Sequence, residues 1–454
     1  MSVEGYGCVG FYCLIQIKKW LRADFIYLKN WTKSLSFPMT NTIPKHYGAV
    51  AYVLITFFFI SFLTNILGAL NPSASESFQL NKTMVSFLPF AFFLAYGVMS
   101  IPAGLLLERI GQKKLLLIAF LLAFMGSLLF VLLPSFTFFL IALFTIGCGM
   151  AILQVVVNPL LRIAGGEENY AFTSVLGQLC FGLASFIAPL VYSWLIMNME
   201  EAETTNQFST TFFGHLIEAN VSWIRIYGIF AVFAMLLFGV TLLMKLPKVS
   251  HNEEEKLGGI GMFQELLKSR TVVLFFLGIF AYVGIEQGIS FWISKFLQQY
   301  HGLDFETVGA TVVSNFWGLM TVGGVAGLVL LKFFDSKLIL KLFTLLTLLS
   351  FLGAVFGSVD WAIYGFQACG FFMAVMYPII ISLGLNSLNQ HHGTFAGILM
   401  TGIVGGAIFQ LFIGFLSDLT SLRIGILFNC IGLLYILFLG FWANPLIKNK
   451  KLGE

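Results

Sequence analysis

Charged residues are scarce in this 454-residue chain, and they avoid long stretches of it. Asp, Glu, Lys and Arg make up 10% of the residues, whereas apolar residues make up 58% and the mean hydropathy is +0.92. No charge occurs in residues 83–107, 115–161, 169–199, 226–244 and 307–331. A soluble domain could not bury so much apolar surface, and a bilayer span needs roughly 20 apolar residues. The sequence therefore predicts a protein that crosses a membrane many times.

Motifs for nucleotide and metal chemistry are missing. No Gly-Lys pair occurs, which excludes the phosphate-binding loop of a nucleotide-driven pump. The six histidines are scattered and no acids are paired within the apolar stretches, which argues against a metal-dependent enzyme in the membrane. The six cysteines show no ligand spacing and are expected to be unpaired thiols. We therefore expect no enzyme activity, no metal and no other cofactor.

Twelve membrane-spanning helices account for the apolar stretches. Unbroken runs rich in Leu, Phe, Gly and Ala favour helices over the alternating strands of a membrane barrel. The expected spans are 47–70, 83–107, 115–133, 136–161, 170–196, 223–246, 271–294, 307–331, 338–357, 361–387, 394–417 and 424–445. The predicted fold class is an all-α integral membrane protein.

The distribution of basic residues predicts the orientation. Lys and Arg collect before the first span, after the second and after the last, whereas the 200–220 loop on the opposite side carries four Glu and neither Lys nor Arg. By the positive-inside rule both termini are cytoplasmic, and we expect a bacterial inner membrane. The net charge of +4 then reflects this topology within the lipid bilayer, and no nucleic-acid partner is expected.

The chain is expected to consist of two related six-helix halves. These are residues 47–246 and 271–445, joined by a polar cytoplasmic linker at 247–270 and followed by a tail at 446–454. Gly104 and Gly327 end corresponding spans with an offset of 327 − 104 = 223, and Pro159 and Pro378 repeat with an offset of 378 − 159 = 219. Residues 1–46 form an extension that is either a basic amphipathic helix at the membrane surface or a dispensable segment before a true start at Met39.

The loop after the second predicted span carries a recognisable motif. Gly104, Glu108, Arg109, Gly111 and Lys113 are spaced as in the signature loop of the major facilitator superfamily, although Glu108 replaces the more usual Asp. Glycines allow a tight turn, and the acid and bases can interact with helix ends. The alternative is a generic basic turn. The resemblance implies a conformational role for this loop.

Motifs in several further spans are similar to those of the fucose, galactose and hexose proton-symporter family. They are Leu153 to Pro159, Tyr282 to Glu286, Tyr377 and Pro378 leading to Gly384, and Gly405 to Ala407 leading to Asp418. The resemblance extends from about Tyr47 onward. It implies the major facilitator fold, two rocking halves, a sugar substrate and a coupled proton.

The resemblance also implies a sugar site. Carried over by motif, it comprises Gln154, Asn158, Gln178 and Tyr377, with Glu286 facing them from the second half. We add Gln287 and Asn315 as further substrate-binding residues. Amides and hydroxyls suit sugar hydroxyls, and an aromatic ring suits the CH face of a sugar. Alternatively, each amide joins neighbouring helices and the tyrosine serves packing.

The chain departs from the family at several polar positions. Leu67 and Gly68 stand where the family pattern has Asn and Asp, Gln154 stands in place of a Glu, and Gly324 stands in place of an Arg. The usual proton-carrying acid of the first half is therefore absent.

Glu286 is then the one acid deep within any predicted span. Burial disfavours the charged form of a carboxyl group, so Glu286 can take up and release a proton as the cavity alternates between the two sides. A purely structural hydrogen bond is the alternative role.

Taken together, the residues predict a monomeric secondary transporter that moves a monosaccharide or amino sugar by alternating access, with proton symport. The alternatives are an uncoupled facilitator of another small polar solute and a sugar sensor that does not transport. The sequence does not identify the sugar.

Overall fold

The computed structural model describes residues 47–165, 170–205, 222–246, 264–388 and 392–446. All regular elements in these ranges are helices, and twelve of them are long and apolar enough to cross a membrane. Each of the twelve overlaps one expected span, so the predicted fold class is confirmed. The expected extension, most of the expected linker and nearly all of the expected tail lie outside the described residues.

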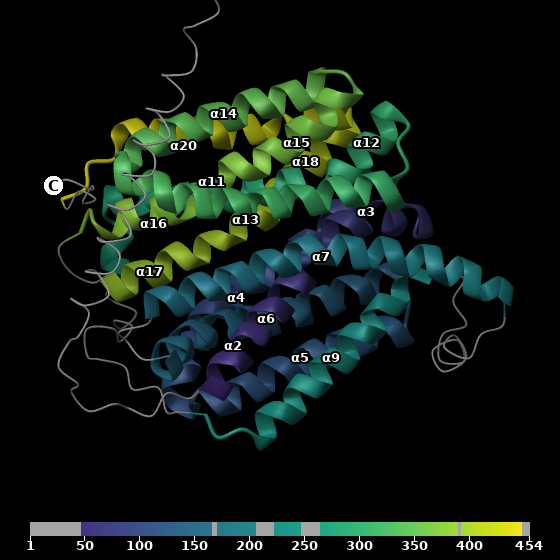
Figure 1. Ribbon diagram of the computed structural model, residues 1–454, viewed down its shortest axis with the longest axis horizontal. Helices are drawn as coiled ribbons and strands as arrows, with labels where there is room; N and C mark the ends of the chain where they lie inside the picture. Colours follow the sequence, from purple (N-terminus) through teal and green to yellow (C-terminus); the bar gives the residue numbers. More distant parts are fainter. Residues whose placement is uncertain (1–46, 166–169, 206–221, 247–263, 389–391, 447–454) are drawn as a thin grey trace, which may run out of the picture. The chain divides into compact units, whose positions relative to one another are not determined.

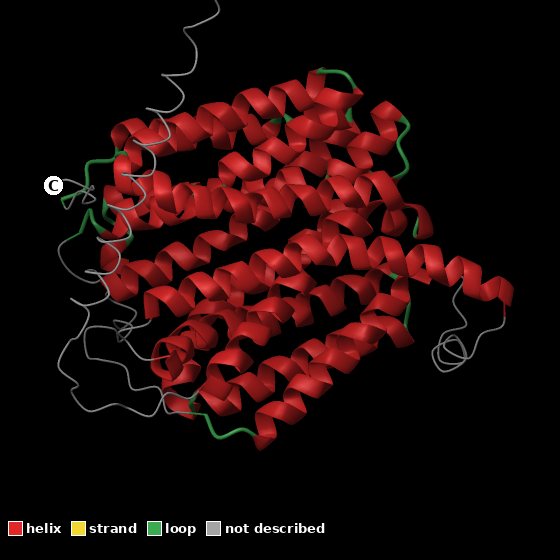
Figure 2. Cartoon of the chain, in the orientation of Figure 1, coloured by secondary structure: helices red, strands yellow, loops and turns green. Residues whose placement is uncertain are grey.

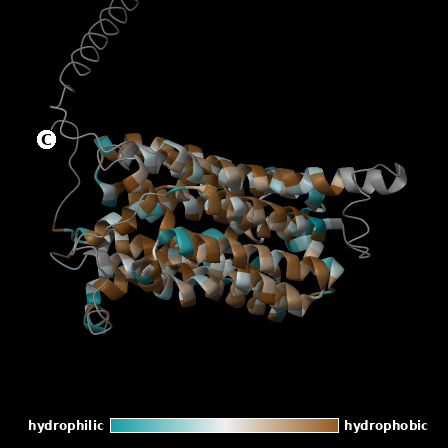
Figure 3. Cartoon of the chain, turned by 90° about the horizontal axis from the view of Figure 1, so that it is seen from below, coloured by the Kyte–Doolittle hydropathy of each residue, from teal (hydrophilic) through white to brown (hydrophobic). Residues whose placement is uncertain are grey.

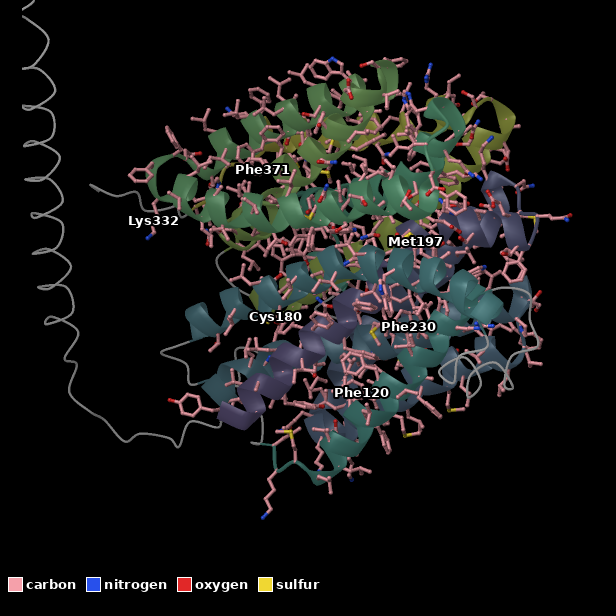
Figure 4. All side chains as sticks on the ribbon, turned by 45° about the vertical axis from the view of Figure 1, so that its right-hand side comes forward. Phe120, Cys180, Met197, Phe230, Lys332 and Phe371 are labelled. Atoms are coloured by element: carbon pink, nitrogen blue, oxygen red, sulfur yellow. The ribbon has the colours of Figure 1, made fainter. Side chains whose placement is uncertain are left out.

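The first half contains the helices α2 to α9. Their bounds are α2 (Tyr47–Asn65), α3 (Leu67–Ser77), α4 (Lys82–Ile110), α5 (Gln112–Leu132), α6 (Phe136–Gly165), α7 (Tyr170–Thr205), the 3-10 turn η2 (Ser222–Ile224) and α9 (Arg225–Leu243). Within this half α4 packs against α6, α6 against α5, α5 against α9 and α2 against α7. Figure 4 shows Phe120 of α5 and Phe230 of α9 inside this half, where both are buried.

The second half contains the helices α11 to α20. Their bounds are α11 (Arg270–Ser290), α12 (Ile293–His301), the π-turn η4 (Phe305–Gly309), α13 (Ala310–Phe333), α14 (Ser336–Phe356), α15 (Val359–Met373), α16 (Met376–Leu385), α17 (His392–Thr401), the 3-10 turn η5 (Gly402–Val404), α18 (Gly405–Leu419), α19 (Leu422–Ile426) and α20 (Phe428–Trp442). Figure 1 shows these helices grouped beside those of the first half.

The helices run side by side, so their connections gather at two ends of the bundle (Figure 2). We call the end at which α2 begins the near end; it also holds the turn at Gly111 and the start of α14. The far end holds the turns after α3, α12, α14 and α18. Figure 3 shows hydrophobic residues along the helices and hydrophilic residues mostly towards the ends. This pattern is that of a membrane-spanning bundle.

The two halves repeat each other in how their helices approach. A methyl group at Gly147 of α6 would overlap the Phe92 carbonyl oxygen of α4, and one at Gly370 of α15 would overlap the Phe316 carbonyl oxygen of α13. The offsets are 370 − 147 = 223 and 316 − 92 = 224. These glycines bring the same helix pair together in each half, because only a residue without a side chain allows such an approach.

The first span is longer than the sequence predicts. It was expected to end at residue 70, but α3 continues through Pro72 to Ser77. Polar groups in this extension are satisfied inside the bundle: the Asn71 amide donates to the Phe291 carbonyl oxygen over 2.8 Å, and Ser73 hydrogen-bonds to Tyr192. A polar segment can therefore remain helical and buried where hydropathy alone ends the span.

Candidate functional site

Glu286 lies on the face of α11 that points away from α18 and α20. A Cβ at Gly284 would collide with the Phe409 ring of α18, and one at Gly288 would collide with Asn429 of α20. Residue 286 is two positions from each glycine, or about 200° around the helix, so its side chain leaves on the opposite side. Tyr282 is one turn away on this same face. Glu286 is partly exposed, whereas Tyr282 is 4% exposed.

Tyrosines from two helices surround this carboxyl group. The Tyr282 hydroxyl and the Glu286 carboxyl share a hydrogen bond. The ring of Tyr377, from α16, lies with its centroid 5.6 Å from that of Tyr282 at an interplanar angle of 47°. The Tyr377 hydroxyl lies 3.4 Å from the Met400 sulfur of α17. Tyr377 thus connects α16 both to Tyr282 of α11 and to Met400 of α17.

A buried amide holds α11 in its rotation. Gln410 of α18 is fully buried, accepts a hydrogen bond from the Trp292 indole over 2.8 Å and donates to the Gln287 carbonyl oxygen over 2.6 Å. Gln287, predicted to bind substrate, is itself 8% exposed. The structure therefore places the Gln287 backbone in a helix-to-helix contact, while Glu286, beside it in sequence, is partly exposed.

The predicted residues of the first half lie on α6 and α7. Gln154 and Asn158 are one turn apart on α6, both half-buried, and the Asn158 amide donates to the Gln154 carbonyl oxygen over 3.4 Å. Gln178 is exposed near the start of α7. With a rise of about 1.5 Å per residue, Gln154 lies about 27 Å along α6, and Glu286 lies about 24 Å along α11. Both are therefore well inside the bundle, and their joint role stays a prediction.

Asn315 lies apart from the Glu286 cluster. It lines a groove of about 390 Å³ between α13 and α15, together with Gln367, Thr311 and the exposed Tyr364. Its neighbour Ser314 instead faces the first half and donates to the Phe186 carbonyl oxygen over 2.6 Å. The groove and the Glu286 cluster share no residue.

The signature loop joins two helix ends. Gly111 adopts a φ of 80°, a conformation that favours glycine. The Lys113 ammonium donates to the Leu242 and Met244 carbonyl oxygens at the end of α9, each over 2.8 Å. Gly104 is half-buried and Arg109 is exposed, while the Glu108 side chain lies outside the described residues. The loop therefore caps the last helix of its own half.

Sequence reasoning missed the polar contacts that join the two halves at the far end. The Asp418 carboxylate of α18 accepts from the backbone N–H groups of Lys82 over 3.0 Å and Thr83 over 2.7 Å, at the start of α4. Gln298 of α12 donates to Glu76 of α3 over 2.9 Å. Asp418 stood out only as an acid at a helix end, and sequence offers no signal of which helix it caps.

A lysine beside this contact is partly buried. Lys295 donates to the Gln298 amide oxygen over 3.1 Å. Burial lowers the pKa of the Lys295 ammonium, whereas the nearby Glu76 carboxylate acts in the opposite direction. The far end thus holds acids and bases within its contacts, unlike the surroundings of Glu286.

Two positions at which the chain departs from its expected family have distinct surroundings. A Cβ at Gly68 would lie 2.7 Å from the Ser290 carbonyl oxygen of α11, so an acid could not stand there in this arrangement. A Cβ at Gly324 would meet nothing within 4 Å, so the space next to it is open.

Comparison with known proteins gives consistent matches. The sequence profile of the Major Facilitator Superfamily matches residues 53–408. A glucose/galactose transporter of Brucella abortus is 32% identical over 409 residues, which cover 87% of this chain and 94% of that protein. The L-fucose-proton symporter of Escherichia coli is 23% identical over 376 residues, covering 80% and 85%. The crystal structure of the E. coli fucose:proton symporter matches with a TM-score of 0.63 at 20% identity, covering 88% and 99%.

Proposed function

This chain belongs to the major facilitator superfamily, and from that premise we propose that it moves a monosaccharide or amino sugar across a bacterial inner membrane by alternating access, with proton symport. The observation that carries the proposal is the partly exposed Glu286 carboxyl group deep within the spans, hydrogen-bonded to Tyr282, whose ring lies beside that of Tyr377. The names of the similar proteins, a glucose/galactose transporter and a fucose-proton symporter, support a sugar and a proton as its cargo.

The substrate site in this proposal lies between the halves. The Tyr377 ring provides a flat apolar surface for the CH groups of a sugar, and Gln154, Asn158 and Gln178 provide amides for its hydroxyls. Gln287 and Asn315 are weaker members, because Gln287 is nearly buried and Asn315 lines a separate groove.

Alternating access requires the halves to close one end at a time. The far end is closed by the contacts of Asp418 with α4 and of Glu76 with α12. Away from that end, Gly406 of α18 meets Phe93 of α4, and Gly182 of α7 meets Thr321 of α13. We propose that this arrangement opens towards the near end.

The near end is cytoplasmic in this proposal, which makes both termini cytoplasmic. The described basic residues at that end, Arg109, Lys113, Lys114, Arg270, Lys332 and Lys337, outnumber its acids, as the positive-inside rule requires. Figure 4 shows Lys332 at this end of α13. The protein is expected to act as a monomer in the lipid bilayer.

Coupling follows from where Glu286 lies. A carboxylate in a low-dielectric span is costly, so the halves change conformation most readily when Glu286 carries a proton. With sugar and proton bound the halves rock, and opening to the cytoplasm releases both. An uncoupled facilitator is the second candidate, because no acid stands at Leu67, Gly68 or Gln154.

Transport by the purified protein in liposomes tests the proposal. Labelled glucose, galactose, fucose and N-acetylglucosamine are offered with and without an inwardly directed proton gradient. We expect at least one sugar to accumulate above equilibrium only with the gradient. Equilibration without accumulation identifies a facilitator, and binding without counterflow identifies a sensor; either result contradicts proton symport.

A further inference from the structure

The charge surroundings of Glu286 are unusual for an acid deep within a membrane span. The Tyr282 hydroxyl hydrogen-bonds to it and the Tyr377 hydroxyl lies close enough to interact electrostatically with it. No basic side chain of the described residues acts on this carboxyl group. On α20, which packs against α11, the Tyr435 hydroxyl donates to the Leu274 carbonyl oxygen, three turns from Glu286.

A carboxylate without a positive neighbour is costly in a low-dielectric site that is closed to water on both sides. The site therefore needs one positive charge beside Glu286 while the halves rock. A proton provides that charge when the sugar is neutral. A sugar that carries its own ammonium group could provide it instead. One cation therefore neutralises the Glu286 carboxylate, and this cation can be a proton or the ammonium group of the sugar.

The geometry around Glu286 also suits an ammonium group. The Tyr282 and Tyr377 rings lie 5.6 Å apart at 47° and border the carboxyl group from two helices. Aromatic faces attract ammonium ions, and the attraction is larger where water is excluded. The site thus offers an ammonium group two attractions: the negative charge of Glu286 and the faces of two tilted tyrosine rings.

We infer that this site accepts a protonated 2-amino-2-deoxyhexose in place of a neutral sugar and a proton, which rests on the transport function proposed above. One positive charge then crosses per cycle with either substrate. The neutral sugar moves with a proton, whereas the amino sugar moves with none and keeps its own. A sugar acid is excluded, because its carboxylate would lie against Glu286 with no cation between them.

Three hexose ligands that differ in charge separate these cases. Galactose is neutral, glucosamine carries an ammonium group below the pKa of its amine, and N-acetylglucosamine is the uncharged counterpart of glucosamine. Full-length protein in liposomes that contain a pH-sensitive dye is given each sugar at a pH that keeps glucosamine protonated. Liposomes without protein correct for leakage of the free amine.

The expected result is accumulation of glucosamine driven by an inside-negative membrane potential, without protein-dependent acidification of the lumen. The neutral sugar that is transported should acidify the lumen under the same potential. Protein-dependent acidification with glucosamine would overturn the inference. So would a failure of glucosamine to compete with a transported neutral sugar, and this result would leave the proposed function standing. If no neutral sugar is transported, the proposed function itself fails.

Competition in a variant assigns the effect to the carboxyl group. In Glu286→Gln, glucosamine should compete with labelled neutral sugar in counterflow roughly 10- to 100-fold less well, whereas N-acetylglucosamine should compete as before. Asp360→Asn, at an exposed acid at the start of α15, is the matched control and should leave both unchanged. Equal loss of competition by both amino sugars would contradict a charge-based role.

Discussion

Gly68 explains in physical terms why one expected acid is missing. Its Cα hydrogen faces the backbone of α11, where a Cβ would lie 2.7 Å from the Ser290 carbonyl oxygen. The first span therefore contacts α11 directly through backbone, and polar chemistry at this depth is left to Glu286. A glycine at position 68 thus both removes the expected acid and allows the close approach of α3 to α11.

Substitution of this glycine should weaken far-end closure. In Gly68→Ala the added methyl group forces α3 away from Ser290, so we expect counterflow of the transported sugar to slow several-fold. Gly48→Ala, where nothing lies within 4 Å, is the control and should transport normally. Equal rates for the two variants would show that the contact at Gly68 is not needed for the cycle.

The start of helix α4 is hydrogen-bonded to an acid from the other half. Asp418 bonds to its first two backbone N–H groups, so α4 is capped in part by α18. Such a bond can exist only when the far end is closed, because opening separates the two helices. The cap thus stabilises one conformation of the transporter over the other.

Removal of this cap should favour the open far end. A cap of this kind contributes about 0.5 to 2 kcal/mol, so Asp418→Ala should shift the conformational equilibrium and increase hydrogen exchange at residues 82–86. Asp335→Ala removes a cap within one half, on the Lys337 N–H, and should leave exchange at α4 unchanged. Unaltered exchange in the Asp418 variant would contradict the role given to this bond.

Lys113 joins α5 to the end of α9 in the first half, and the second half has a counterpart. Lys337 at the start of α14 lies 3.3 Å from the Asn444 amide oxygen after α20, with an offset of 337 − 113 = 224. The repeated position indicates that each half ties its last helix to its third.

Truncation at Lys113 should destabilise the first half. Lys113→Ala leaves two carbonyl oxygens without their partner and should cost about 1 kcal/mol, observed as a lower Tm in detergent. Lys114→Ala, an exposed neighbour, is the control. If both variants melt together, the capping role of Lys113 is wrong.

The architecture was largely predictable because charge gaps and helix length report membrane spans directly. The spans, their number and the family followed from the sequence, and the offset near 223 reappears in the contacts of Gly147 and Gly370. The rotation of each helix was not predictable. Lipid and protein neighbours are both apolar, so hydropathy does not tell which face looks inward. The placement of Asn315 in a side groove, and of Asp418 on α4, depends on that rotation.

Partner choice between the halves was hidden for the same reason. Tyr282 and Tyr377 lie 95 residues apart by 377 − 282, and only the packing of α11 against α16 brings their rings together. Glu286 could be identified because one acid within an apolar span is chemically exceptional. The amides of α6 gave a weaker signal, since such residues also join helices.

The account as a whole depends on Glu286 carrying the proton while the sugar crosses. Glu286→Gln holds the protonated shape permanently, so the variant should exchange sugar across liposomes in counterflow at close to the normal rate and yet fail to accumulate it under a proton gradient. If both activities are lost, a measurement of sugar binding to the same variant shows whether the substrate site is still intact. Gradient-driven accumulation equal to that of the unaltered protein would show that Glu286 does not couple the proton to transport.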